Sequence, residues 1–146
     1  MGLFSKNYDR DRVSIQQLKS YIEANGLRVT SCQDDGKTAL LVVDTVSTQL
    51  NIAYQKELSL TTLSPYDMYY DGPCSQEQIQ RIIVEGINMP SVKVKAVRIG
   101  YAFSFGLSIQ MNHRYFSLEE FDKNMERLGT AMEKAGLALE RKGILS

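Results

Sequence analysis

The sequence contains little of what enzymes and metalloproteins commonly depend on. Its 146 residues include one histidine, two cysteines, three prolines and no tryptophan. A Ser-His-Asp triad would have to use His113, and the chain has no Gly-x-Ser-x-Gly turn to present a nucleophilic serine. Zinc would need several nitrogen or sulfur ligands at regular spacing. We therefore predict no catalytic residues, no cofactor and no metal, and we interpret His113 as a polar residue at a strand end.

An excess of charge is missing as well. Lysine and arginine total 17 and aspartate and glutamate total 17, so the formal net charge is zero. A nucleic-acid-binding protein normally carries a basic excess or a basic patch. The one local cluster, Lys93, Lys95 and Arg98, is typical of a solvated strand face. We expect no nucleic-acid partner.

Long apolar runs and paired cysteines are also absent. No stretch reaches the roughly 20 apolar residues needed to span a bilayer, so we expect no membrane partner. Cys32 and Cys74 lie far apart in the sequence, in no redox or metal-binding spacing. A reduced, cytoplasmic compartment is the simplest explanation for such cysteines.

The clearest pattern present is a strict alternation from Tyr101 to Met111. Every odd position there is large and apolar, and every even position is small or polar. A period of two over this length indicates a strand with one buried face. The β-branched run Val92–Ile99 precedes it and should pair with it around Gly100. Because the apolar residues of that run change phase, we expect a bulge or irregular turn near Ala96–Gly100.

Three helix starts share one signature. Ser14, Ser75 and Ser117 are each followed three residues later by glutamine or glutamate, and each has an apolar residue just before it. This capping box with a hydrophobic staple predicts helices over residues 13–25, 75–88 and 117–142. In the last helix Gly129 and Gly136 suggest a close approach to the sheet. They lie beside a predicted core-facing stripe of Leu118, Phe121, Met125, Leu128, Met132, Ala135 and Leu139.

The segment between the first two helices predicts a meander. Strands are expected at 27–33 and 37–44 around an Asp-Asp-Gly turn, and at 49–54 and 57–63. Residues 1–12 are polar and without period, so we expect a frayed tail before a single domain over residues 13–146. The elements together predict an α+β fold, an antiparallel sheet with three helices mostly on one face.

Two surfaces are candidate protein contacts. The even face of residues 101–112 carries no charge, and Ser104, Gly106 and Ser108 form a low strip on it. Leu40 and Val42 make the strand at 37–44 apolar on both faces. A face of this kind left in water invites association, so we expect an interface, first of all that of a homodimer. An uncharged polar sheet facing water is the alternative.

The second candidate surface is the segment containing Tyr66, Met68, Tyr69 and Tyr70. Tyrosine and methionine in a loop are typical of adaptable contact surfaces, although the same residues could fold back as a lid over the core. A pocket joining Tyr66–Tyr70 with His113 would instead indicate a small-ligand-binding or enzymatic domain, which is our alternative function.

The chain resembles the YbjN-like family of bacterial sensory transduction regulators over roughly residues 13–139. The resemblance lies in the element order (a helix, three or four meander strands, a helix, a hairpin and a helix) and in three local patterns. These are Gly26-Leu-Arg-Val followed by Asp34-Asp35-Gly36, Ile87-Asn88 leading into Val92-Lys-Val-Lys-Ala-Val97, and Ser117-Leu-Glu-Glu-Phe.

This resemblance implies the two-layer type III secretion chaperone-like fold, in α-β-β-β-α-β-β-α order. It also implies a cytoplasmic, non-enzymatic bacterial protein that is often dimeric and binds other proteins. We therefore expect a protein-binding module, chaperone-like or regulatory, that acts as a homodimer on another protein or peptide segment.

Overall fold

The computed structural model describes residues 14–34, 39–44, 49–54, 58–63, 68–111 and 117–145, with only the backbone for residues 54, 58–63 and 111. The predicted tail at residues 1–12, Tyr66 and His113 lie outside the described residues. The elements run α2 (Ile15–Ala24), β1 (Arg28–Asp34), β2 (Ala39–Asp44), β3 (Gln49–Tyr54), β4 (Leu58–Leu63), β5 (Met68–Tyr69), α3 (Gln76–Ile87), β6 (Lys93–Ile99), β7 (Ala102–Met111) and α4 (Leu118–Arg141).

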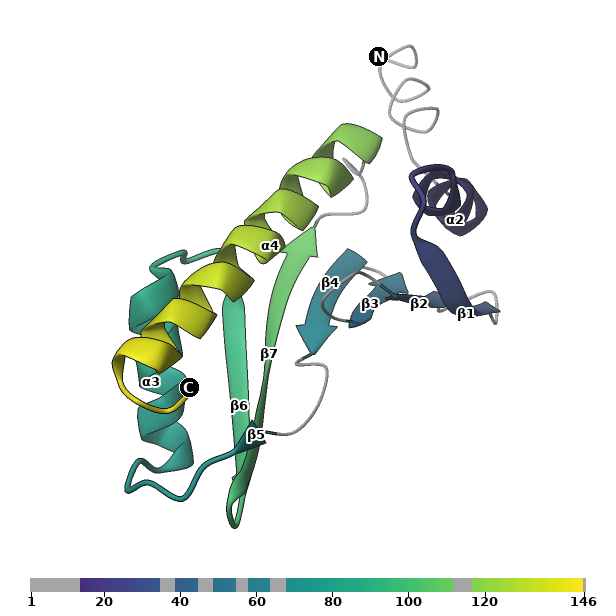
Figure 1. Ribbon diagram of the computed structural model, residues 1–146. Coiled ribbons are helices and arrows are strands. Elements are labelled where there is room, and N and C mark those ends of the chain that lie inside the picture. Colours follow the sequence, from purple (N-terminus) through teal and green to yellow (C-terminus); the bar gives the residue numbers. More distant parts are fainter. Residues whose placement is uncertain are drawn as a thin grey trace.

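One antiparallel sheet joins the described strands (Figure 1). Strands β1 to β4 form a meander, and β4 pairs with the second half of β7. The two-residue β5 pairs with the start of β7 on the same side as β4, and β6 pairs along the other side. The order that the resemblance implies has three strands between the first two helices. The structure has five there, the additional ones being β4 and the short β5.

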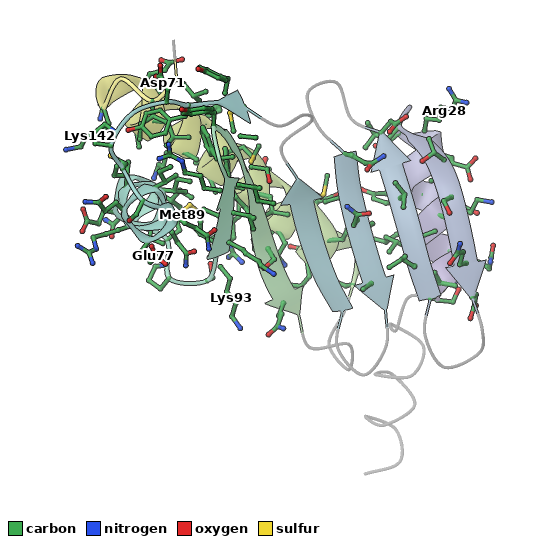
Figure 2. All side chains as sticks on the ribbon, turned by 90° about the horizontal axis from the view of Figure 1, so that it is seen from below. Arg28, Asp71, Glu77, Met89, Lys93 and Lys142 are labelled. Atoms are coloured by element: carbon green, nitrogen blue, oxygen red, sulfur yellow. The ribbon has the colours of Figure 1, made fainter. Side chains whose placement is uncertain are left out.

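Helices α2 and α4 lie on one face of this sheet, and α3 lies along its β6 edge (Figure 2). Helix α2 packs on the β1 end, α4 crosses β7 and β4, and α3 packs against β6 and α4. Figure 2 looks onto the opposite face, with α2 and α4 behind the strands. The Tyr21 hydroxyl donates to Asp122 at 2.6 Å and joins α2 to the start of α4. The predicted α+β fold with an antiparallel sheet and three helices is confirmed.

The helix starts follow from local chemistry. At α2 the Ser14 hydroxyl accepts from the Gln17 backbone N–H, and the Gln17 side chain accepts from the Ser14 backbone N–H. Ser75 and Gln78 form the same pair of hydrogen bonds at α3. At α4, Ser117 accepts from the Glu120 N–H, which is the first half of the predicted box. Each such cap stabilises its helix by about 1 kcal/mol. Helix α3 ends on Asn88 with φ 51, two residues before Pro90.

The buried face of β7 is as predicted from Phe103 to Ile109. Its odd-numbered side chains lie in the core, whereas Tyr101 belongs to the turn and is exposed. The prediction of a bulge near Ala96–Gly100 is wrong, because the pairing of β6 with β7 is unbroken from Lys93 to Ile99. Gly100, with φ 61, is the first residue of a two-residue turn, a position that favours glycine. The register shift lies in β1 instead, between Val29 and Ser31.

The buried side of α4 is rotated from the predicted stripe. Asn124 and Ala131 are buried where Met125 and Met132 were expected, and the two methionines are half-buried. The helix packs on α3 as well as on the sheet, so its buried side is centred between these two neighbours. Asn124 donates to the Glu120 carbonyl and accepts from Arg127, which satisfies this buried amide.

The close approach of α4 lies at a different glycine from those predicted. A Cβ at Gly129 or Gly136 would meet no atom within 4 Å, so the prediction that these two approach the sheet is wrong. A Cβ at Gly86 of α3 would overlap the Cβ of Ala138. The tight contact is therefore between two helices rather than between a helix and the sheet.

Candidate functional site

The sheet face turned away from the helices is called the open face below (Figure 2). No helix in the described part of the chain covers it. The predicted contact residues on strands, Leu40, Val42, Ser104, Gly106 and Ser108, have strand neighbours buried on the opposite side and therefore lie on this face. The structure thus places the residues of the first candidate surface on one side of the sheet.

The structure does not place these residues side by side. Strands β3 and β4 separate β2 from β7, so Leu40 and Val42 lie about 14 Å from the β7 strip at the usual strand spacing. On one side the neighbours of the strip come from β6, where Val97 is opposite Ser104, Lys95 opposite Gly106 and Lys93 opposite Ser108. On the other side they come from β4, where Leu63 is opposite Gly106 and Thr61 opposite Ser108. The prediction of an uncharged face is therefore wrong along the β6 edge. The pairing register decides this, because it brings two lysines onto the face.

An apolar group lies at the turn end of the β6–β7 hairpin. We call Tyr69, Val97, Ile99 and Tyr101 the tip cluster. Ile99 is 78%, Tyr69 71% and Tyr101 62% exposed, and the two tyrosine rings lie 5.8 Å apart. Tyr69 and Ile99 flank Ala102 from opposite sides in the strand register. Figure 1 shows this turn projecting beyond β5.

The apolar members of β6 in this cluster were missed at the sequence level. The change of phase at Val97 and Ile99 was the available signal. That change of phase predicts a bulge or irregular turn near Ala96–Gly100. In the structure the strand stays regular, so both side chains lie on the open face.

The tyrosine segment divides between the core and the surface. Met68 packs against the core, and Tyr70 is buried with its ring edge-on to Phe103, the centroids being 6.1 Å apart. Tyr69 lies between them in the chain and faces outward. The lid interpretation therefore describes Met68 and Tyr70, and the contact-surface interpretation stays a prediction for the exposed Tyr69.

Arg98 holds the tyrosine segment to the hairpin. Its Nη1 donates to the Gly72 carbonyl at 3.1 Å and also to the Cys74 carbonyl. Its Nη2 donates to the Tyr70 carbonyl at 3.1 Å, and its Nε donates to the Gly100 carbonyl at 3.0 Å. The interpretation of Lys93, Lys95 and Arg98 as one solvated face is wrong for Arg98, which is half-buried on the opposite side of β6.

The ring of Tyr70 completes this arrangement. The Arg98 guanidinium carbon lies 4.8 Å from the ring centroid, a cation–π contact. The Tyr70 hydroxyl accepts from the Cys74 N–H at 3.2 Å. The Cys74 side chain, followed by burial, raises the pKa of Tyr70 above its ordinary value, although the Cys74 N–H and Arg98 act in the lowering direction. A Cβ at Gly72 would overlap the Tyr70 ring, so this turn requires glycine.

The outer edge of β6 is closed by two glutamines of α3. Gln76 Oε1 accepts from the Arg98 N–H at 2.9 Å, and Gln80 Oε1 accepts from the Ala96 N–H at 3.4 Å. The two glutamines are four residues apart on the helix, and their two N–H donors are two residues apart on the strand. Both separations are about 6–7 Å, so the side chains and the donors are in register. A partner strand would have to displace these side chains to add to the sheet at this edge.

Other kinds of site would need a pocket, a group of metal ligands or a reactive thiol. An open depression of about 370 Å³ runs along α3, lined by Gln76, Glu77, Gln80, Arg81, Val84 and Glu85. Within the described ranges, no three histidine, cysteine or acidic side chains come together as metal ligands. Cys32 and Cys74 are half-buried free thiols. A pocket of Tyr66–Tyr70 with His113 stays a hypothesis, because Tyr66, Asp67 and His113 lie outside the described residues.

These observations define an α+β protein with an open sheet face and an apolar hairpin tip. Comparison with protein-family models, curated proteins and solved structures found no match to the chain. The resemblance to the YbjN-like family therefore stays a prediction. None of the described helices is long and apolar enough to cross a membrane.

Proposed function

We propose that this protein is a non-enzymatic protein-binding module whose contact surface is the open face. One observation carries the proposal: no described helix covers the face of the sheet on which Leu40, Val97 and Ile99 are exposed (Figure 2). Exposed apolar side chains gathered on one side of a folded domain mark interaction surfaces more often than those scattered singly.

The composition of the face favours a protein as the partner. Tyrosine is enriched at protein interfaces, because its ring gives a large contact area and its hydroxyl can hydrogen bond. The open face has Tyr69 at one end and small residues along β7. Because Gln76 and Gln80 close the adjacent edge, a partner at this half would use the face rather than add a strand.

A second copy of the chain is the first partner that we propose. Leu40 and Val42 are the apolar residues of the β2 part of the face, far from the lysines of β6. In a two-fold dimer the Leu40 and Val42 patch of one copy would pack on the same patch of the other. Most homodimers have this symmetry. The module would act in the cytoplasm as a chaperone or regulator, in keeping with its two free thiols.

A photo-crosslinking amino acid placed at single positions tests the proposal. The chain offers a matched pair, since Val97 is 36% exposed on the open face and Val84 is 48% exposed on α3. With the crosslinker at Leu40 for the β2 half of the face, or at Val97 for the β6–β7 half, irradiation of cells making the protein should yield discrete crosslinked proteins on a denaturing gel. With the crosslinker at Val84, the same treatment should leave the protein uncrosslinked.

The result contradicts the proposal if neither position 40 nor position 97 yields an adduct, or if position 84 yields the same adducts as they do. An adduct of twice the chain mass would identify a second copy. An adduct of another mass would identify a different protein on the same face.

A further inference from the structure

We infer that the β6–β7 half of the open face binds an amphipathic helix of a partner protein, with apolar side chains on the tip cluster and acidic side chains on Lys93 and Lys95. This inference rests on the proposed function and specifies the chemistry of the partner. It depends on the shape, the charge and the closed edge of this half of the face.

Side-chain size and strand register together imply a shallow groove along β7 on this half of the face. Small residues form its floor, in the order Ala102, Ser104, Gly106 and Ser108. Larger residues of β6 stand directly opposite them and form one wall, in the order Ile99, Val97, Lys95 and Lys93. At the tip, Tyr69 stands opposite Ala102 on the other side and forms the start of a second wall. A floor without large side chains lets a partner backbone approach closely.

The charge of the groove is divided along its length. Its turn end is apolar, and its other end carries the exposed Lys93 and Lys95. In the described ranges neither lysine has an ion-pair partner, and Lys93 Nζ lies 3.5 Å from Gln110 Oε1. Figure 2 places the exposed Asp71 at the opposite end of this half from Lys93. A complementary partner therefore has acidic residues at the lysine end.

A helix fits this surface better than an extended segment. The inner side of β6 is paired to β7, and Gln76 and Gln80 occupy two outward N–H groups of its other edge. An extended segment lying across the face would have few backbone groups to bond. A helix satisfies its own backbone and can pack an apolar stripe on a sheet.

The strand geometry sets the spacing expected in the partner. Lys95 and Lys93 lie four and six residues from Ile99 along β6, about 14 and 20 Å at the rise of an antiparallel strand. At the rise of a helix these distances correspond to about 9 and 13 residues. The partner helix should therefore have apolar anchors near one end and acidic residues about 9–13 positions away.

The test is selection from a displayed library of 18-residue peptides in a helix-forming background, with the outward positions randomised. The wild-type protein should enrich peptides in which apolar residues and acidic residues are separated by about 9–13 positions. Fluorescence anisotropy then measures the affinity of the best enriched peptide for the wild type and for variants. The variants alter exposed residues, and a thermal melt of each verifies that it is folded.

Two variants examine the two ends of the groove. Lys93→Glu with Lys95→Glu should weaken binding about tenfold and weaken it less at high salt. Ile99→Ser with Tyr101→Ser should weaken it about 30-fold, as expected for apolar anchors. Lys134→Glu with Lys142→Glu makes the same change of charge on exposed positions of α4 and its end, and it should leave the affinity unchanged.

Peptides without acidic enrichment whose binding still depends on Ile99 and Tyr101 would overturn this inference and leave the proposed function standing. Failure to enrich any peptide would overturn this inference alone, and the crosslinks from positions 40 and 97 would decide the proposed function separately. Binding to vesicles of phosphatidylserine and phosphatidylcholine that requires the tip cluster, in the absence of peptide binding, would overturn the inference in favour of a lipid surface.

Discussion

Arg98 is a charged residue whose role is structural. Its guanidinium donates to four backbone carbonyls and stacks over Tyr70, so it joins the tyrosine segment, the turn after it and the hairpin turn. Hydrogen bonds from a charged donor are stronger than neutral ones, and a planar guanidinium can serve several acceptors at once. Arg98 thereby holds Tyr69 and Tyr101 in the positions that form the tip cluster.

Replacing Arg98 should therefore lower stability. Arg98→Met removes the donors and leaves their carbonyl acceptors partly buried, so we expect a loss of about 2–3 kcal/mol in the free energy of unfolding. Arg98→Lys keeps the charge without the planar fork and should recover only part of the loss. Urea denaturation measures both changes.

The control for this prediction is on the same strand. Lys95 is exposed and on the other face of β6, so Lys95→Met should change stability by no more than about 0.5 kcal/mol. Similar losses for Arg98→Met and Lys95→Met would contradict the role given to Arg98.

At the scale of elements, α3 makes different contacts on different sides. Ile79, Ile83 and Ile87 lie in the core, Gln76 and Gln80 close the β6 edge, and Gly86 lies against Ala138 of α4. The helix thus covers an edge and sets the distance to α4. Because β6 is protected in this way, its open-face side chains can be apolar without offering a free strand edge.

The contact of Gly86 with Ala138 gives an element-scale prediction. Gly86→Ala adds a methyl where the Ala138 Cβ already lies, and we expect a net loss of about 1 kcal/mol, since overpacking exceeds the gain in helix propensity. Adding Ala138→Gly should restore part of the loss, because it removes the opposing methyl. Thermal and urea unfolding of the single and double variants measure this coupling.

Gly129 is the matched control, because a Cβ there meets no atom within 4 Å. Gly129→Ala should raise stability by up to about 1 kcal/mol. If Gly86→Ala also raised stability, the two helices would not be in the close contact described.

At the scale of the whole molecule, the protein is a sheet with helices on one side. The buried apolar residues of β2, β3, β6 and β7 face α2, α3 and α4, while the other side has Leu40 and Val42 near one end and the tip cluster near the other. Because these two regions are separate, the proposed second copy and the proposed different partner are compatible on one face.

Homodimer formation through the β2 region predicts the mass in solution. Light scattering across a dilution series should give twice the chain mass for the wild type, and Leu40→Glu should shift the equilibrium to the monomer by placing a charge in the contact. Leu40 is 38% exposed in the single chain, so Leu40→Glu should barely change the stability of the monomer. The melting temperatures of the variant and the wild type, extrapolated to low protein concentration, should therefore be similar.

Val84→Glu adds the same charge to an exposed apolar position on α3 and should leave the mass at that of the dimer. A wild type that is monomeric at micromolar concentration would rule out the homodimer. The open face would then remain as a surface for other proteins.

The sequence by itself determined where most elements lie and the buried face of β7. The serine caps depend on residues three positions apart, and the alternation from Phe103 to Ile109 depends on strand geometry alone, so both could be predicted locally. The predicted candidate-site residues Ser104, Gly106, Ser108, Leu40 and Val42 lie on one face for the same reason.

Tertiary structure alone decided which of these residues are neighbours. The order of strands separates Leu40 from Ser104, and the register of β6 on β7 brings Lys95 and Val97 onto the open face. The burial of Arg98 depends on carbonyls up to 28 positions away, and the contact of Gly86 with Ala138 depends on how α3 and α4 cross. Periodicity along a chain reports which face a side chain occupies, but only the pairing of distant segments determines what that face meets.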